Sequence, residues 1–171
     1  MILAFTGMPG VGKSTAITYI KNNTDVIVHS TDKIRKELFE TPEYTSEESK
    51  KTYNTLFSRV KQSVSNGETV VIDATMNLEK GRAEVESISN ETECSTLFVH
   101  VTCREKVAKS RLQKRSNNDD TVSDATVSTY DEFYFEPLTR DNVTIDNSTT
   151  MEALQAQLEA RVIPIIDGER K

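Results

Sequence analysis

The residues with the most evident chemistry stand near the start of the chain, where Gly7–Thr15 read Gly-Met-Pro-Gly-Val-Gly-Lys-Ser-Thr. Two glycines with four residues between them, followed by a lysine and a hydroxyl residue, form the pattern of a phosphate-binding loop. Glycine lets the backbone turn sharply and present N–H groups to phosphate oxygens, and the helix that follows adds its positive end. The pattern predicts a nucleotide site formed by Gly7, Pro9, Gly10, Val11, Gly12, Lys13, Ser14 and Thr15.

Lys13 and Ser14 have distinct predicted roles in this loop. The Lys13 ammonium is expected to reach the β- and γ-phosphates of ATP, and the Ser14 hydroxyl is expected to ligate Mg²⁺. The apolar run Ile2–Phe5 precedes the loop, and apolar residues at helical spacing follow it. This strand, loop and helix setting is the one that the motif requires, and it disfavours the alternative of a Gly-Pro turn with an exposed lysine.

A carboxylate ends the apolar run Val70-Val71-Ile72-Asp73. Ligands of open parallel sheets bind at the carboxyl ends of the strands, so Asp73 is placed to hold Mg²⁺ through water or to orient Lys13 and Ser14. The alternative is an aspartate that caps a turn. No glutamate follows Asp73, as motor ATPases need, and no Asn-Lys-x-Asp run selects guanine. Phosphoryl transfer to an acceptor is therefore favoured over motor ATPase or GTPase activity.

Asp32 and Arg35 are three residues apart and share one face of an expected helix. Asp32 is suited to accept the proton of an acceptor hydroxyl or to hold that hydroxyl in line for attack. Arg35 is suited to clamp a phosphate or carboxylate of the acceptor. The alternative is an aspartate that stabilises the start of a helix beside a surface arginine.

Arg111 and Arg115 lie four residues apart on a basic helix of an otherwise acidic chain, and the polar stretch 116–120 follows at once. We expect a lid at about 112–125 that carries these arginines over the γ-phosphate, where they neutralise charge and exclude water. The alternative is a basic helix face in contact with solvent.

Apolar runs of strand length alternate with amphipathic helical patterns along the chain, which predicts an α/β fold with a parallel sheet covered on both faces. The strands are expected at 2–6, 26–29, 69–73, 96–101 and 143–145. The helices are expected at 13–21, 31–39, 46–66, 79–89, 105–115, 124–135 and 151–161. The segment 161–171 has no clear pattern and is open to two interpretations, a last strand or a subunit contact.

The 171 residues and the net charge of −6 suit a single domain and argue against a broad surface for duplex DNA. No basic region precedes a long apolar run, and no run of apolar residues is long enough to span a membrane, so a cytoplasmic protein without a membrane partner is expected. Cys94 and Cys103 flank one expected strand, too far apart for a disulfide, and are expected to be reduced thiols.

These motifs together resemble the P-loop kinase superfamily, and within it the kinase domain of 5′-polynucleotide kinases and the related zeta-toxin and predicted kinases. The resemblance covers about the first 135 residues and rests on four motifs: Gly7–Thr15, Ser30–Arg35, Val71–Thr75 and Arg111–Arg115. It implies a P-loop kinase fold with a five-stranded parallel sheet in the order 2-3-1-4-5 and a helical lid. In this family an Asn often follows Asp-x-Thr directly, whereas here Met76 stands before Asn77.

Carried over to this chain, the resemblance implies a kinase that uses ATP and Mg²⁺. Asp32 would act as the base toward the acceptor hydroxyl, Arg35 would bind a neighbouring phosphate of the acceptor, and Arg111 and Arg115 would be lid arginines. The expected acceptor is the 5′-OH end of a nucleic acid. A small-molecule or aminoacyl-tRNA kinase is the first alternative, and a nucleotide-binding regulator without enzymatic activity is the second. The oligomeric state stays open.

Overall fold

The computed structural model describes residues 1–115 and 125–169, with the side chain of Arg115 left out. Five parallel strands form one sheet in the order β2-β3-β1-β4-β5, which confirms the predicted order. The strands are β1 (Ile2–Thr6), β2 (Ile27–Ser30), β3 (Val70–Asp73), β4 (Thr96–Thr102) and β5 (Asn142–Asp146). The helices are α1 (Lys13–Asn23), α2 (Thr31–Leu38), α3 (Ser46–Ser65), α4 (Glu79–Glu91), α5 (Glu105–Arg115), α6 (Val127–Glu132), α7 (Met151–Arg161) and α8 (Ile163–Gly168).

Strand β1 occupies the centre of the sheet, and all five of its residues are buried. Its side chains alternate between two cores: Leu3 and Phe5 face one, and Ile2 and Ala4 face the other. A strand that is buried on both faces has no polar alternation, which explains the continuous apolar run in the sequence. The glycine loop follows directly at the carboxyl end of this strand.

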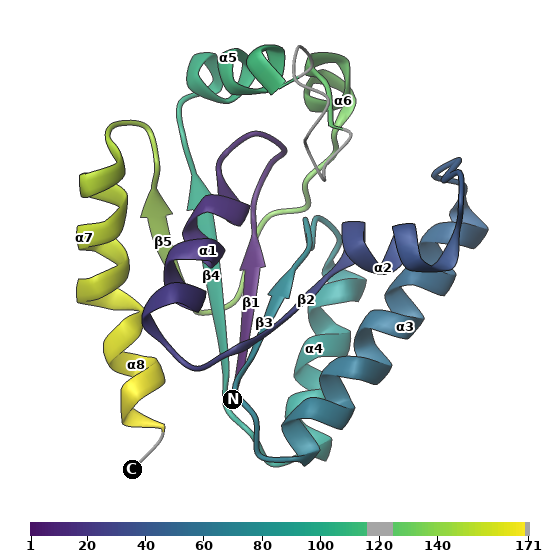
Figure 1. Ribbon diagram of the computed structural model, residues 1–171, viewed down its shortest axis with the longest axis vertical. Helices are drawn as coiled ribbons and strands as arrows, with labels where there is room; N and C mark the ends of the chain where they lie inside the picture. Colours follow the sequence, from purple (N-terminus) through teal and green to yellow (C-terminus); the bar gives the residue numbers. More distant parts are fainter. Residues whose placement is uncertain (116–124, 170–171) are drawn as a thin grey trace.

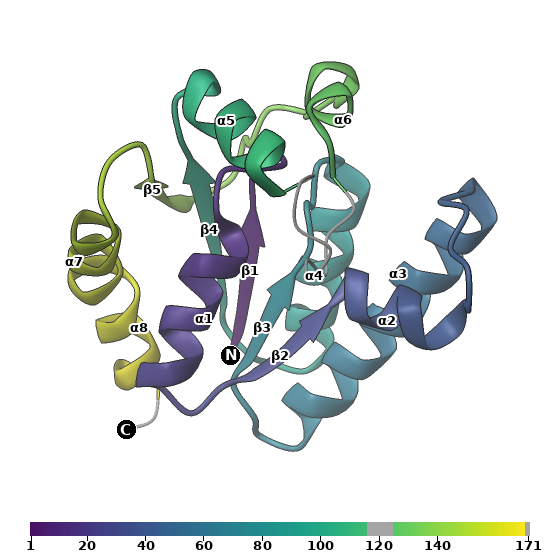
Figure 2. The same ribbon diagram turned by 45° about the horizontal axis from the view of Figure 1, so that its top comes forward.

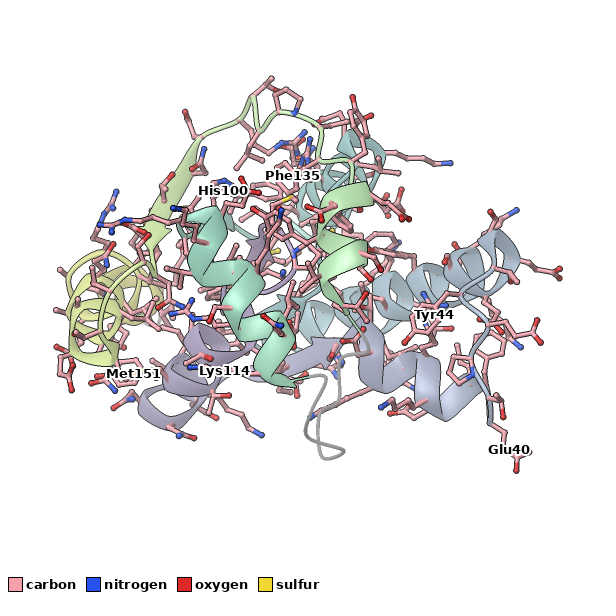
Figure 3. All side chains as sticks on the ribbon, turned by 90° about the horizontal axis from the view of Figure 1, so that it is seen from above. Glu40, Tyr44, His100, Lys114, Phe135 and Met151 are labelled. Carbon is pink, nitrogen blue, oxygen red and sulfur yellow. The ribbon has the colours of Figure 1, made fainter. Side chains whose placement is uncertain are left out.

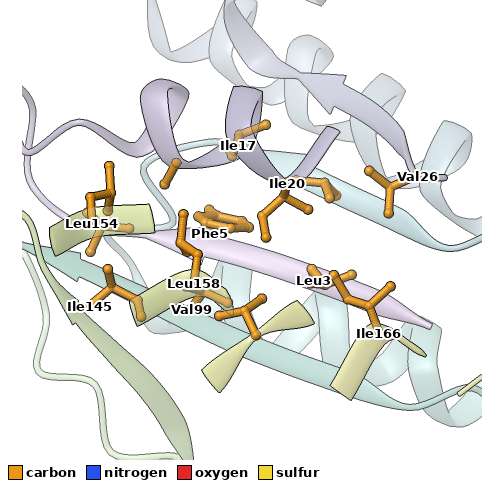
Figure 4. Packing of buried hydrophobic residues seen from close by; sticks show 14 of the residues in the cluster. Leu3, Phe5, Ile17, Ile20, Val26, Val99, Ile145, Leu154, Leu158 and Ile166 are labelled. Carbon is orange, nitrogen blue, oxygen red and sulfur yellow. The ribbon is translucent and has the colours of Figure 1, made fainter. Parts of the chain in front are cut away.

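The first core lies between the sheet and the helices α1, α7 and α8 (Figures 1 and 4). Its C-terminal part overturns the interpretation of the segment 161–171 as a last strand as far as residue 169, because this part forms helix α8, and the subunit contact stays a prediction. Pro164 stands in the first turn of α8, where a helix tolerates proline. Val162 and Ile166 are fully buried, so the segment completes the core of this chain.

The second core lies between the other face of the sheet and the helices α2, α3 and α4. Helix α3 begins and ends as its sequence predicts. The Thr45 hydroxyl accepts a hydrogen bond from the Glu48 amide at 3.2 Å, and Gly67 has the left-handed φ of +79° that ends the helix. The apolar face of α3 buries Leu56 and Val60.

Helices α5 and α6 lie beyond the carboxyl ends of the strands, as two views show (Figures 1 and 2). Helix α6 is shorter than the predicted range 124–135. It begins after Thr126, whose side chain and backbone exchange hydrogen bonds with Thr129, and it ends where the chain becomes extended at Phe133. In the ranges 1–115 and 125–169, no helix combines the length and the apolar character that crossing a membrane requires.

Candidate active site

The phosphate-binding loop joins β1 to α1 and has the backbone geometry that its glycines predict. Gly7, Gly10 and Gly12 have φ angles of +143°, +77° and +95°. Gly12 is the N-cap residue of α1, and no side chain caps the first amides of this helix. Amides at a helix start that no side chain satisfies are available to an anion, and the helix dipole favours negative charge there.

The three glycines are also required by close contacts with the rest of the molecule. A Cβ atom at Gly7 would lie 2.3 Å from the Val101 carbonyl oxygen, at the end of β4. One at Gly10 would lie 2.8 Å from the Ala108 carbonyl oxygen of α5, and one at Gly12 would lie 2.2 Å from Asn147 Nδ2. The loop is therefore packed from outside by β4, by α5 and by the segment after β5.

The substitution Gly12→Ala is expected to destabilise the fold and to weaken nucleotide binding together. The new methyl group would displace Asn147, and alanine disfavours the φ of +95°. The matched control is Gly67→Ala, because Gly67 has a similar φ of +79° but no atom within 4 Å of a Cβ. The control should cost about 1 kcal/mol in the free energy of unfolding, and Gly12→Ala should cost at least about 2 kcal/mol more. Equal losses in urea unfolding would contradict this prediction.

Lys13 is held inside the curl of the loop. Its ammonium group donates to the carbonyl oxygens of Gly7 at 2.9 Å and Met8 at 3.1 Å. The side chain of Ser14 is exposed at the start of α1. The lysine and the serine therefore stand at the start of α1, next to the loop, and their roles toward phosphate and Mg²⁺ stay predictions.

Asp73 and Asp32 lie at the carboxyl edge of the sheet beside the loop. Asp73 stands opposite Phe5 and Ser30 in the strand register, and Asp32 is in the first turn of α2. Burial raises the pKa of the Asp73 carboxyl above its usual value, and the neighbouring Asp32 adds to the rise. Lys13 opposes this rise. The two carboxylates and the loop lysine thus form one electrostatic unit.

The substitution Asp73→Asn is expected to stabilise the fold at neutral pH while it impairs turnover. A folded pKa above the unfolded value means that burying the charged carboxylate costs free energy, and this cost grows as the pH rises through the folded pKa. The asparagine keeps an oxygen for the Ser30 hydroxyl and carries no charge. The melting temperature should rise at pH 7, and the difference from wild type should vanish below about pH 4. A melting temperature that falls at pH 7 would contradict the buried position of the charge.

Arg35 is buried, with 6 % of its surface exposed, and so is not the surface arginine of the alternative interpretation. Its Nη1 atom lies 3.6 Å from a carboxylate oxygen of Glu48, and its Nη2 atom donates to Ser49 Oγ at 3.4 Å. The Tyr44 ring covers the guanidinium at 4.7 Å. Helix α3 thereby holds this cation beside Asp32, on the side of the site where an acceptor is expected.

Tyr53 of α3 contacts the segment that follows β3. Its hydroxyl group forms a hydrogen bond with the Thr75 side chain, and the charged groups of Asp32 and Arg35 lie close enough to affect its ionisation. Burial is the main reason that the pKa of Tyr53 is raised, so the phenol stays protonated and can serve as a donor. The ring of Tyr53 is partly buried and packs against the second core.

A groove of about 820 Å³ opens between α3 and α4, and its lining includes Ser49, which accepts from Arg35, and Tyr53. The Tyr53 and Phe57 rings lie 5.8 Å apart on one wall. Three lysines also line the groove, and one of these, Lys61, pairs with Glu91 at 2.5 Å. The full lining is Ser49, Lys50, Tyr53, Asn54, Phe57, Ser58, Lys61, Met76, Asn77, Leu78, Lys80, Gly81, Glu84, Ile88 and Glu91.

Arg111 contacts the loop from the opposite side. Its Nη1 atom donates to the Val11 carbonyl oxygen at 3.3 Å and its Nη2 atom to Asn147 Oδ1 at 3.4 Å. Asn147 Nδ2 donates to the same Val11 oxygen at 2.9 Å. Sequence reasoning missed Asn147, although its position directly after β5, at the carboxyl edge of the sheet, could have identified it.

A second cavity, of about 270 Å³, lies beside these contacts. Seen from above, Lys114 and Met151 border this side of the molecule, and Tyr44 lies on the other side (Figure 3). Its lining residues are Gly12, Thr15, Arg111, Lys114, Asn147, Thr149 and Met151. The phosphate loop thus borders this cavity through Gly12 and Thr15, whereas the larger groove begins at Met76, in the loop after β3.

Arg115 ends helix α5, but its side chain lies outside the described residues, as do residues 116–124 of the lid predicted at about 112–125. Its role as a lid arginine stays a prediction. Within the described ranges, no three His, Cys, Asp or Glu side chains gather to form a metal site. The oxygen donors Ser14 and Asp73 suit Mg²⁺, which takes few protein ligands and binds mainly phosphate and water.

Comparisons with known proteins agree with this geometry. The chain matches the family model AAA_33, described as an AAA domain, over residues 2–137. Among curated proteins no sequence relative was found. Adenosine phosphosulfate (APS) kinase from Mycobacterium tuberculosis, solved with AMPPNP and APS, superposes with a TM-score of 0.71 at 14 % identity, over 97 % of this chain and 96 % of that one.

Two further solved structures share the fold. A gluconokinase from Sinorhizobium meliloti 1021 has a TM-score of 0.68 at 15 % identity, with 97 % of this chain and 93 % of that one covered. A sugar kinase from Janibacter sp. HTCC2649 has a TM-score of 0.67 at 18 % identity, with 97 % and 94 % covered. The chain therefore belongs to the AAA_33 family of AAA domains and has the P-loop kinase fold.

Proposed function

We propose that this protein is a phosphotransferase that moves the γ-phosphoryl group of ATP to a hydroxyl group of a small-molecule acceptor. The observation that carries the proposal is the position of Asp32 and Asp73 beside Lys13. Free helix amides and a lysine on one side can bind the triphosphate, and a carboxylate on the other side can hold the attacking hydroxyl. In the proposed complex, donor and acceptor lie on opposite sides of the transferred phosphoryl group.

Positioning and neutralisation of charge supply most of the catalysis in this mechanism. The transition state of phosphoryl transfer is loose, with negative charge on the equatorial oxygens of the transferred group. The loop amides and Lys13 face that charge, and Asp32 orients the acceptor hydroxyl and takes its proton late in the transfer. Magnesium bound near Ser14 and Asp73 would further neutralise the phosphate oxygens.

The cavity of about 270 Å³ is the proposed place of the donor base. It lies next to Gly12 and Thr15, and Arg111 offers a planar cation for stacking. ATP as donor is supported by the AMPPNP complex of the M. tuberculosis APS kinase, which shares this fold.

The groove of about 820 Å³ is the proposed place of the acceptor. This volume is in the range of small-molecule sites, and the similar folds include an APS kinase and a gluconokinase. These observations favour a small molecule over the 5′-OH end of a nucleic acid that the sequence resemblance implied. The nucleic acid end is the second candidate, because Tyr53 and Phe57 offer aromatic rings on which a base can stack.

Transfer of ³²P from [γ-³²P]ATP to a panel of acceptors tests the proposal. The panel contains hydroxy acids, sugars, nucleosides, nucleotides, 5′-OH oligonucleotides and aminoacyl-tRNA. Labelling of a small molecule supports the proposal, and labelling of only the oligonucleotide or the tRNA assigns the acceptor to nucleic acid. ATP binding without transfer to any acceptor would overturn the phosphotransferase and favour a nucleotide-binding regulator.

A further inference from the structure

Arg82 in the first turns of α4 is fully buried and yet carries a charge. Its Nη1 atom donates to the Met76 carbonyl oxygen at 2.8 Å. Its Nη2 atom donates to the carbonyl oxygens of Glu136 at 3.2 Å and Pro137 at 3.1 Å, and its Nε atom donates to a carboxylate oxygen of Glu79 at 3.2 Å. A buried charge costs several kcal/mol unless such partners compensate it. The guanidinium thus binds two segments that are far apart in the sequence.

The same two segments also contact each other directly. The Glu136 amide donates to the Asn77 carbonyl oxygen at 2.9 Å, and Asn77 Nδ2 donates to the Tyr134 carbonyl oxygen at 3.0 Å. We call this set of contacts between residues 76–79 and 133–137, together with Arg82, the clasp. Asn77, which the sequence resemblance left without a clear role, is a member of the clasp.

One side of the clasp fixes the loop after β3. Met76 has a left-handed φ of +45°, which is uncommon for a residue with a side chain. Its carbonyl oxygen also accepts from the Thr6 hydroxyl at 3.4 Å, and the Thr75 carbonyl oxygen accepts from the same hydroxyl at 3.1 Å and from the Gly7 amide at 3.4 Å. Tyr53 bonds to the Thr75 side chain. The loop therefore connects the start of the phosphate loop to the acceptor wall.

The other side of the clasp, residues 133–137, contributes the aromatic ring of Phe135. The Phe135 ring lies 5.6 Å from the Arg82 guanidinium carbon and 5.5 Å from the His100 ring. His100 and Phe135 lie together at one side of the carboxyl edge (Figure 3). His100 stands opposite Thr6 in the sheet, and burial lowers the pKa of its ring, with a further contribution from the charge of Lys13. A movement of the Phe135 ring would therefore change the environment of His100, whose strand neighbour Thr6 directly precedes the phosphate loop.

We propose that Arg82 is a positioning residue of the transfer site. Through the clasp, it holds the loop after β3, and with it the Tyr53 side of the groove, in a fixed position relative to the phosphate loop. Arg82 contacts neither nucleotide nor acceptor in this arrangement, and it acts through Met76 and Phe135. The inference rests on the proposed function for the reaction that is affected, but the clasp itself is a property of the fold. The amphipathic pattern of α4 gave no sign of it.

Two pairs of variants test the inference. Arg82→Met removes the donors, and its control is Arg59→Met, since Arg59 of α3 forms an exposed ion pair with Glu37 of α2 at 2.7 Å. Glu136→Ala removes the carboxylate that accepts a hydrogen bond from the Glu79 amide. Glu136→Gln keeps a side-chain oxygen that can accept this hydrogen bond. The readouts are the melting temperature, the Kd for Mg-AMPPNP, kcat for transfer to the acceptor found in the panel, and the NMR signals of the His100 ring.

Arg82→Met and Glu136→Ala should lower kcat about tenfold or more, since small misplacements of reacting groups have such effects. The Kd for Mg-AMPPNP should stay within about threefold of wild type, because the loop amides and Lys13 remain. The His100 signals should move in both variants and stay unchanged in Glu136→Gln and Arg59→Met. A folded Arg82→Met with the kcat and His100 signals of wild type would overturn the inference. If Arg82→Met does not fold, equal kcat in Glu136→Ala and Glu136→Gln overturns it.

Failure of the proposed function is a separate result. If the wild-type protein labels no acceptor, the proposed phosphotransferase function is wrong. The clasp must then be tested by measurements that do not depend on turnover. Hydrogen exchange of the Glu79 and Glu136 amides, together with the His100 signals, then decides the question. Faster exchange in Glu136→Ala than in Glu136→Gln, with moved His100 signals, supports the clasp, and identical behaviour of the two variants overturns it.

Discussion

Replacing Lys13 by alanine is expected to reduce kcat about 100- to 1,000-fold, the range seen when one preorganised donor to a developing charge is removed. The ammonium group lies inside the loop, 2.9 Å from the Gly7 carbonyl oxygen, at the point where the phosphate-binding motif places the β- and γ-phosphates. Its loss removes positive charge from the transferred group and leaves two loop carbonyl oxygens without this donor. The effect on kcat should exceed the effect on ATP affinity, because the charge on the γ-phosphoryl oxygens is concentrated in the transition state.

Steady-state transfer of ³²P, with the Kd for Mg-AMPPNP measured in parallel, checks this expectation. The matched control is Lys21→Ala, which removes an exposed lysine from the last turn of the same helix. The control should keep the kcat of wild type and the helical circular dichroism signal. A Lys13→Ala protein that is folded and retains most of its kcat would show that the loop does not bind the transferred phosphate.

The sequence was most informative where a pattern is local. The phosphate loop could be recognised because its glycines, lysine and serine are contiguous, and the flanking strand and helix follow simple periodicities. Six of the seven predicted helices agree with the structure to within about two residues, which is the usual uncertainty of helix ends. Helix α6 is the exception, because Thr126 and Thr129 start it later than the apolar pattern suggests.

Contacts between distant segments were not accessible from the sequence. The sequence left open whether Arg35 binds an acceptor or is a surface arginine, and only the packing of α3 shows that it is buried beside Glu48. Asn147 contacts Val11 across 136 positions of the chain, and Arg82 contacts Pro137 across 55. No local periodicity encodes such pairs, because a side chain that binds a carbonyl oxygen needs only the backbone of its partner. The groove proposed for the acceptor has the same origin, since its walls come from the two helices α3 and α4.

Replacing Asp32 by asparagine is expected to lower kcat about 100-fold or more and to leave ATP affinity within about threefold of wild type. Asparagine has nearly the same shape as aspartate and can still form a hydrogen bond with the acceptor hydroxyl, but it cannot accept the proton of that hydroxyl. Asp32 lies in the first turn of α2, and the amides proposed to bind the triphosphate belong to the loop and to the start of α1. The change therefore separates acceptor activation from nucleotide binding. The same assays apply, with Asp167→Asn on the exposed face of α8 as the control.

The pH profile gives this prediction a second, independent readout. The charge of Asp32 contributes to the raised pKa of Asp73, so its removal should lower the pKa of Asp73. If transfer needs the Asp73 carboxylate, the acidic limb of the residual kcat profile should then move to lower pH than in wild type. An Asp32→Asn protein with unchanged kcat would show that the acceptor hydroxyl lies elsewhere. A reduced kcat with an unmoved acidic limb would instead separate Asp73 from the chemical step, because the limb would then report another group.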